Sequence, residues 1–164
     1  LEALGNVVAS KDKIVHIKPH GAMYNQAAKN KDLADAIVDA ITDYNKDLIL
    51  LALSGSQMIE SAKAKGVKYA SEVFADRAYE ADGSLRARSL ENSMITDEDL
   101  AVERVIKMVK TGKVTAYTGE EIDIEAHSVC VHGDSEKAFV FVQKLNEAFS
   151  KNGIETVGLI EAIK

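Results

Sequence analysis

The sequence predicts an α/β domain in which parallel strands alternate with helices. The run "DLILLAL" at residues 47–53 is apolar without alternation, which is typical of a strand covered on both faces in a parallel sheet. Such runs are separated by segments with apolar residues at helical spacing, so the order is strand, helix, strand, helix, strand, loop, helix, strand, helix. This order indicates a parallel sheet, either open and doubly wound or closed as a barrel.

The first half of the chain provides three expected strands and two helices. Strands are expected at residues 14–18, 47–53 and 67–74. Apolar residues at helical spacing predict a helix over 32–44, and a second helix is expected over 57–65. The residues that interrupt regular structure stand where these elements should end, namely Pro19, Gly21, Gly55 and Gly66.

The second half begins with a long polar stretch at residues 75–95. A connection of about twenty residues in a compact domain is usually functional or disordered. Thr96 and Asp99 then form a pair similar to a capping box, which predicts a helix that ends at Gly112. The remaining elements are expected to be a hairpin or two short strands in 113–126, a strand over 127–131, a helix over about 135–152 and an extended piece at 154–160.

Composition limits the class of protein. Apolar residues make up 46% and charged residues 28% of 164, which fits one globular domain spanning residues 1–164. The net charge of −6 argues against a nucleic-acid partner, which requires a surplus of Lys and Arg. No apolar run reaches the roughly 20 residues that cross a bilayer, so no membrane partner is expected. Cys130 is the only cysteine, so an internal disulfide is excluded and a cytoplasmic location is the expectation.

Polar side chains follow the ends of the predicted strands. In parallel α/β folds the loops after the carboxyl ends of the strands meet on one side, where reactive groups gather. The opposite connections contain only short polar turns. We therefore expect a site built from residues at the ends of four strands. They are Lys18, His20 and Asn25, then Ser54, Gly55, Ser56 and Gln57, then Glu72, Asp76, Arg77 and Arg88, then His132 and Asp134.

Each candidate also has a structural interpretation. His16 lies inside a strand and is more simply a hydrogen-bonded core residue, and Asp134 is equally well a helix N-cap. His127 precedes its strand and is interpreted as structural. Metal binding is weakly indicated, because His20, His132 and a carboxylate lack the short ligand spacing of known metal motifs. No phosphate-binding glycine motif is present.

Three blocks of sequence together resemble the LamB/YcsF family. They are "IKPHGAMYN" (17–25), "SEVFADRAYEADGSLRARS" (71–89) and "SVCVHGDS" (128–135), of which the second is the most specific. The resemblance covers nearly the whole chain. It implies an irregular (β/α) barrel similar to that of polysaccharide deacetylases, of which this chain would form the carboxyl-terminal portion.

The resemblance also implies an activity. This is cleavage of the lactam ring of 5-oxo-L-proline to L-glutamate, driven by ATP and shared with 5-oxoprolinase subunits B and C. The positions that match the family motifs are candidate site residues. The candidates for catalysis are His20, His132, Asp76 and Asp134. The candidates for substrate binding are Lys18, Asn25, Glu72, Arg77 and Arg88, and Asp82 also matches but has no assigned role. A metal requirement stays unknown.

The sequence departs from the family pattern in two places. An acidic "DLNxDxGE"-like segment and a "HAGDP" segment are absent, and Glu91-Asn92-Ser93 stands where "PGA" is common. A partial barrel exposes unpaired strand edges. We therefore expect this chain to associate with a partner or a second copy, to exchange elements with it, or to be part of a longer chain, and to be inactive alone. The alternatives to the lactam-cleaving enzyme are a divalent-metal amide hydrolase similar to the deacetylases and a non-catalytic subunit that binds substrate.

Overall fold

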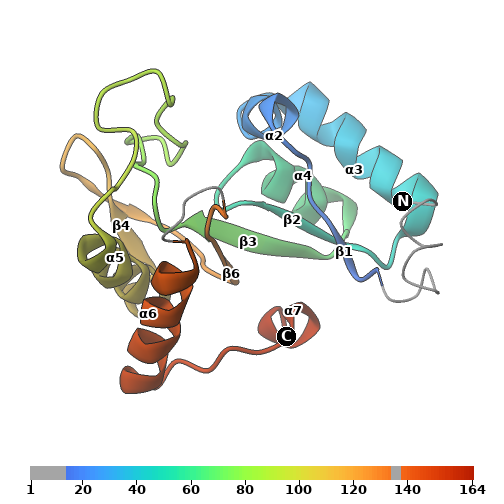
Figure 1. Ribbon diagram of the computed structural model, residues 1–164. Coiled ribbons are helices and arrows are strands. Elements are labelled where there is room, and N and C mark those ends of the chain that lie inside the picture. Colours follow the sequence, from blue (N-terminus) through green and yellow to red (C-terminus); the bar gives the residue numbers. More distant parts are fainter. Residues whose placement is uncertain (1–13, 134–137) are drawn as a thin grey trace. The chain divides into compact units, whose positions relative to one another are not determined.

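The computed structural model describes residues 14–133 and 138–164 (Figure 1). These residues form two compact units, one ending at Ala70 and the other beginning at Ser71. Strand β3 (Tyr69–Phe74) crosses this boundary, so its first residues belong to one unit and its last residues to the other. Asp134, a candidate for catalysis, lies outside the described residues.

The strands of the first unit are parallel and apolar. Strand β1 (His16–Ile17) pairs in parallel with β2 (Ile49–Leu53), with His16 opposite Ile49. All five residues of β2 are buried. This burial confirms the interpretation of the continuous apolar run as a strand covered on both faces.

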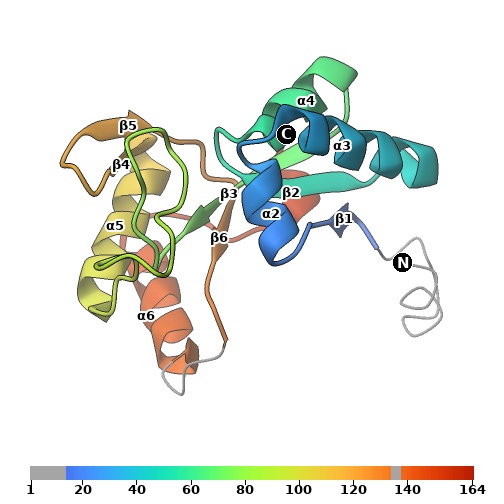
Figure 2. The same ribbon diagram turned by 90° about the horizontal axis from the view of Figure 1, so that it is seen from above.

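Three helices accompany these strands: α2 (Ala22–Ala27), α3 (Lys31–Asn45) and α4 (Gln57–Lys65). Helices α3 and α4 pack against each other (Figures 1 and 2). A hydrogen bond of 2.5 Å from the Ser61 hydroxyl to Asp35 Oδ1 joins them. The helix forms as predicted, but its buried side differs from the expected face of Leu33, Ala36, Ile37, Ala40 and Ile41. The buried residues are Ala34, Val38 and Ile41, whereas Ala36 and Ala40 are exposed.

The second unit contains the other parallel strand pair. The end of β3 runs beside β6 (Ser128–Cys130), with Glu72 opposite Ser128 and Phe74 opposite Cys130. The hydrogen-bonded order of the strands is β1-β2-β3-β6. Parallel strands separated by helices confirm the predicted α/β class. In the described part of the chain, no helix combines the length and apolar content needed to cross a membrane.

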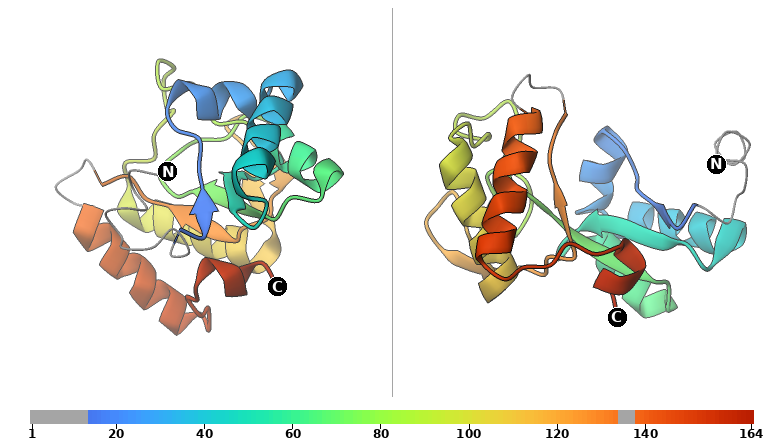
Figure 3. Two further views of the ribbon diagram at one scale, coloured as in Figure 1. Left: turned by 90° about the vertical axis from the view of Figure 1, so that its right-hand side faces the viewer. Right: turned by 60° about the horizontal axis from the view of Figure 1, so that its bottom comes forward.

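Two long helices provide the core of the second unit. Helices α5 (Glu98–Thr111) and α6 (Ala138–Lys151) lie side by side (Figure 3). Burying apolar surface of this kind stabilises a fold by about 25 cal/mol per Å². The buried residues of this core are Ala75, Ala101, Val105, Phe141 and Leu145.

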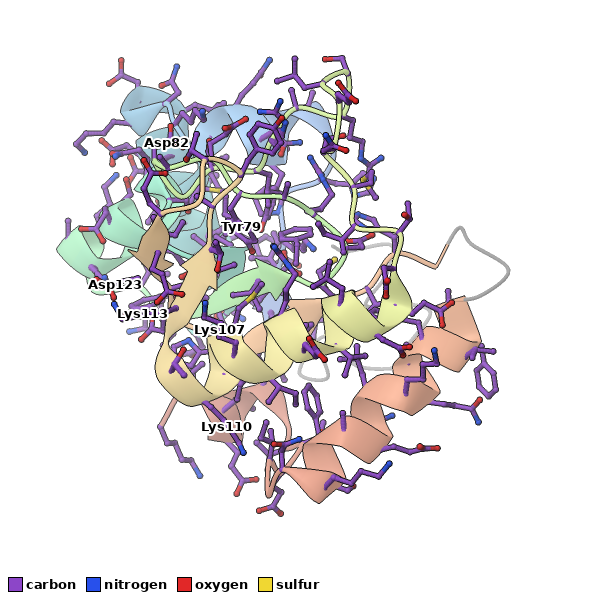
Figure 4. The ribbon with its side chains drawn as sticks, turned by 90° about the vertical axis from the view of Figure 1, so that its left-hand side faces the viewer. Tyr79, Asp82, Lys107, Lys110, Lys113 and Asp123 are labelled. Atoms are coloured by element: carbon purple, nitrogen blue, oxygen red, sulfur yellow. The ribbon has the colours of Figure 1, made fainter. Side chains whose placement is uncertain are left out.

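A short hairpin follows α5 and is joined to it by an ion pair between Lys107 and Glu121. It consists of β4 (Lys113–Thr115) and β5 (Glu121–Asp123), which pair in antiparallel fashion as predicted. Lys113 Nζ lies 2.8 Å from Asp123 Oδ1 across the two strands (Figure 4). Lys107, on α5, reaches the hairpin and donates to the hydroxyl of Thr115 at 3.0 Å.

Two expectations about local structure were wrong, and one helix was missed. Helix α2 was not predicted, because its six residues are too few to show a helical period. Residues 159–162 form helix α7 (Leu159–Ala162), whereas 154–160 were expected to be extended. His16 is exposed rather than a core residue, since β1 pairs with only one strand among the described residues.

The start of α5 also differs from the prediction. Its N-cap is Asp97 and not Thr96. Asp97 Oδ1 accepts hydrogen bonds of 3.0 Å from the backbone N–H groups of Asp99 and Leu100. A carboxylate is a strong cap because it satisfies otherwise unpaired N–H groups and also interacts favourably with the helix dipole.

The Asp97→Ala variant is expected to lower the free energy of unfolding by about 1 kcal/mol, because two N–H groups of the first turn lose their acceptor. Urea denaturation of the chain measures this change. The control is Glu103→Ala, an exposed position within the same helix, which we expect to stay within about 0.5 kcal/mol of the original chain. Equal values for the two variants would contradict this assignment of the cap.

Candidate functional site

His132 and Asp76 are brought together by the register of two parallel strands. Phe74 and Cys130 lie opposite each other at the ends of β3 and β6. Asp76 follows Phe74 by two residues, and His132 follows Cys130 by the same number. Their side chains therefore leave the sheet at the same level, and His132 Nδ1 lies 2.6 Å from Asp76 Oδ2. The structure confirms that the two side chains lie together, as predicted for residues after neighbouring strands.

Arg88 completes this group from the long connection. Its Nη2 lies 3.1 Å from His132 Nε2. A guanidinium can only donate hydrogen bonds, so Nε2 must be the unprotonated, accepting nitrogen of the neutral ring. The proton of the imidazole is then on Nδ1, which donates to Asp76. The contacts thus assign one tautomer to His132, held from both sides.

The connection 75–95 that carries Arg88 is an ordered segment. It folds back on itself through isolated bridges between Arg77 and Met94 and between Tyr79 and Leu85. The buried Tyr79 hydroxyl accepts a hydrogen bond of 2.9 Å from the N–H of Phe74, at the end of β3. Burial raises the pKa of Tyr79 well above its ordinary value, so the hydroxyl stays neutral. These contacts anchor both ends of the segment.

A second set of contacts fixes the tip of the same connection. The Arg86 side chain forms an ion pair with Glu80, with Nη1 2.8 Å from Oε1. Its guanidinium also lies 3.6 Å from the centre of the Tyr117 ring, an arrangement worth about 0.5–1 kcal/mol at exposed sites. Arg88 is two residues further along, so these contacts help to place it.

Arg77, predicted to bind substrate, is buried with only 5% of its surface exposed. Its Nη2 donates to the backbone carbonyl of Arg86 at 2.5 Å, while its own carbonyl accepts from Arg104 Nη2 at 3.1 Å. Burial lowers the pKa of Arg77, and the nearby charge of Arg88 lowers it further. The contacts observed for Arg77 thus support the connection, and its binding of substrate stays a prediction.

A cavity of about 260 Å³ adjoins the Asp76–His132 pair. It lies between the first turns of α5 and α6, and Thr96 and Glu98 are the other polar residues around it. On the strand side, the ring of Phe74 lies 6.0 Å from the imidazole of His132, measured between ring centres. The rest of the lining is apolar and was missed by sequence reasoning, because such residues are indistinguishable from core: Met94, Ile95, Ala101, Val131, Ala138 and Phe141.

The remaining candidates are placed as follows. Lys18, His20 and Asn25 belong to the first unit. Lys18 Nζ lies 5.3 Å from the centre of the Tyr24 ring, and Asn25 Nδ2 donates to the carbonyl of Gly21 at 3.2 Å. His20 is exposed. The participation of these three residues in the site stays a prediction.

Two further candidates lie in the second unit. Glu72, on β3, is only 2% exposed, so it is held inside the fold rather than at the surface. Asp82 Oδ1, in the long connection, accepts hydrogen bonds from the N–H and hydroxyl of Ser84 at 2.9 and 2.5 Å, which is the bonding of a turn. Within residues 14–133 and 138–164, no three His, Cys, Asp or Glu side chains are grouped closely enough to hold a metal ion.

His127 lies at the other end of β6 and has a structural role, as interpreted. The ring nitrogen Nδ1 of His127 accepts a hydrogen bond of 3.1 Å from the backbone N–H of Ser71. The backbone N–H of His127 donates to the carbonyl of Ser71 at 2.9 Å. Glu125 accepts a hydrogen bond of 2.6 Å from the Ser71 hydroxyl. These bonds extend the pairing of β3 and β6 by one step.

The chemistry open to the Asp76–His132–Arg88 group is proton transfer. A neutral imidazole with a free electron pair on Nε2 is a general base, and a carboxylate on Nδ1 fixes the tautomer and stabilises the imidazolium that forms. Arg88 occupies Nε2 in this structure, so it must move aside when a reacting group approaches. An anionic group on the ligand gives it a new partner.

Comparisons with known proteins assign the family. The model of the LamB/YcsF family matches residues 1–164. The chain is 54% identical over 147 residues to a protein of Clostridium beijerinckii named as the A subunit of 5-oxoprolinase, covering 90% of this chain and 58% of that protein. A protein of Fusobacterium nucleatum with the same name is 51% identical over 156 residues, covering 95% and 61%.

A solved structure agrees with these relatives. The crystal structure of a lactam utilization protein from Thermus thermophilus superposes with a TM-score of 0.81 at 33% identity, over 94% of this chain and 61% of that one. This likeness confirms the predicted class of parallel strands alternating with helices. The chain spans about three fifths of the length of the curated relatives that it matches. By sequence and by fold, this chain belongs to the LamB/YcsF family.

Proposed function

We propose that this chain belongs to the A subunit of an ATP-dependent 5-oxoprolinase, which opens the lactam ring of 5-oxo-L-proline to give L-glutamate. The names of its relatives support this proposal, because the curated ones are named as the A subunit of 5-oxoprolinase and the solved one as a lactam utilization protein. The observation that carries it is the Asp76–His132–Arg88 group beside a cavity. The cytoplasm is the proposed location.

The reaction is difficult because a lactam carbonyl is a weak electrophile. ATP, acting as a co-substrate of a complex with subunits B and C, would activate the amide oxygen as a phosphate ester. In this scheme His132 takes a proton from water through Nε2, and the oxygen of that water bonds to the activated ring carbon. The ring C–N bond then breaks, and the nitrogen takes the proton from the imidazolium and becomes the amino group of glutamate. This leaves an acyl phosphate, from which a second water releases phosphate. Asp76 holds the imidazole and stabilises its protonated form, while Arg88 pairs with the substrate carboxylate or the developing negative charge.

A turnover assay tests this proposal. The full-length A subunit containing this sequence is combined with subunits B and C, and glutamate and ADP are measured with 5-oxoproline and ATP. We expect both products to form together, and neither to form at a comparable rate when the full-length chain is left out. If the A subunit binds 5-oxoproline but turnover is the same without it, the A subunit is a substrate-binding subunit and not a catalytic one. Formation of glutamate in the absence of ATP would contradict the proposal that ATP activates the lactam.

A further inference from the structure

The contact between Arg88 and His132 occupies the nitrogen that the proposed reaction needs. Arg88 Nη2 lies 3.1 Å from His132 Nε2, so the electron pair of the neutral imidazole already accepts a hydrogen bond. A general base must be within hydrogen-bond reach of the water whose proton it takes. While Arg88 stays in this position, water cannot take the same place on Nε2, and His132 is held in an inactive arrangement.

The main chain of Arg88 is anchored, whereas the residue itself is accessible. Arg88 lies in a turn that is closed by a hydrogen bond of 2.9 Å from the N–H of Leu90 to the carbonyl of Ala87. The hydroxyl of the buried Ser93 donates to the carbonyl of Arg88 at 3.3 Å. Arg88 is nevertheless exposed to solvent, so a dissolved anion can reach its guanidinium. Release of His132 then requires only rotation about side-chain bonds.

Charge favours an anion as the alternative partner of Arg88. A guanidinium binds a carboxylate through two parallel charge-assisted hydrogen bonds, each roughly twice as strong as a bond between neutral groups, whereas the imidazole offers one neutral acceptor. Burial lowers the pKa of Arg77, and repulsion from the charge of Arg88 lowers it further. A carboxylate beside Arg88 offsets this repulsion. It therefore competes well with the nitrogen of His132.

We propose that Arg88 is the residue that makes the site specific for lactams with a carboxylate, because the substrate carboxylate activates His132 by drawing Arg88 away from Nε2. The inference rests on the proposed function, since 5-oxo-L-proline carries a carboxylate on the carbon next to the ring nitrogen. 2-Pyrrolidinone has the same ring without the carboxylate. It lacks the group that releases His132, so it is discriminated against in the chemical step as well as in binding.

The Arg88→Ala variant is expected to affect the two lactams in opposite directions. The KM for 5-oxoproline should rise about 10–100-fold, because a hydrogen bond between charged groups is lost. Turnover of 2-pyrrolidinone to 4-aminobutanoate should rise about 3–10-fold, because the bond between Arg88 and His132 no longer has to be broken. A variant with a damaged fold loses turnover of both lactams. The control Lys151→Ala removes an exposed cation at the end of α6 and keeps both values.

A second test uses the original complex without substitution. Acetate supplies the carboxylate separately from the ring, so it should raise the turnover of 2-pyrrolidinone to a saturating level. Potassium chloride at the same ionic strength serves as the control for screening and should have no such effect. Acetate should also have no effect on Arg88→Ala, in which Nε2 of His132 is already free.

Amino-acid analysis of the products measures these rates on the complex of the full-length A subunit with subunits B and C, in the presence of ATP. Opposite effects of Arg88→Ala on the two lactams and activation by acetate support the inference. If Arg88→Ala still opens 5-oxoproline but does not open 2-pyrrolidinone faster than the original complex, the inference is wrong and the proposed function stands. If the variant has lost both activities, a lack of activation by acetate in the original complex overturns the inference instead. An original complex that opens neither lactam, with or without acetate, overturns the proposed function together with the inference.

Discussion

The His132→Ala variant is expected to lower the turnover of 5-oxoproline by about 10²–10⁴-fold, which is the range contributed by a positioned general base. The expected loss depends on one atom, the Nε2 nitrogen of His132. Nε2 is the accepting nitrogen of the neutral imidazole, because Arg88 donates to it at 3.1 Å while Nδ1 is engaged with Asp76. Removing the imidazole takes away the only nitrogen electron pair that this group holds beside the cavity.

Steady-state formation of glutamate by the complex measures the loss. His132→Asn is the informative second variant, because its amide NH₂ is suited to keep the bond to Asp76 while no basic nitrogen remains. Added imidazole should restore part of the turnover of His132→Ala by occupying the space that the side chain left. Original rates in both variants would contradict the assignment of His132 as the base.

His127→Gln is the matched control for the loss of an imidazole. His127 lies at the start of β6, where its Nδ1 accepts the N–H of Ser71 at 3.1 Å. Its loss should lower the free energy of unfolding by about 1 kcal/mol, the net value of a typical hydrogen bond, and leave turnover largely intact. The two histidines at opposite ends of one strand thus separate a structural role from a chemical one.

The core of the site could be predicted from the sequence because it depends on local rules. A continuous apolar run predicts a parallel strand, and polar residues just after two such strands meet at one edge of the sheet. Asp76 and His132 each follow a paired strand end by two residues, so the register alone brings them together. Gly112 likewise marks the end of α5 correctly, through the left-handed backbone that a helix C-cap favours.

Other parts of the site depend on contacts between distant residues, which no local pattern encodes. The position of Arg88 is set by a connection that folds back on itself, with Arg86 stacked on Tyr117 from the hairpin between β4 and β5. The tautomer of His132 is known only once Arg88 is placed. Arg77 has the sequence context of a surface ion pair, yet its guanidinium is buried against a backbone carbonyl. Short helices such as α2 leave too few turns for a period to be read.

The Asp76→Asn variant is expected to lose about 10³–10⁴-fold in kcat, because a neutral amide cannot stabilise the imidazolium that His132 becomes when it takes a proton. Its amide oxygen still accepts from Nδ1, so the imidazole stays in place and the loss concerns charge rather than position. Rates of glutamate formation at saturating substrate measure it, with Asp123→Asn as the control. A kcat within tenfold of the original would show that Asp76 does not act through His132.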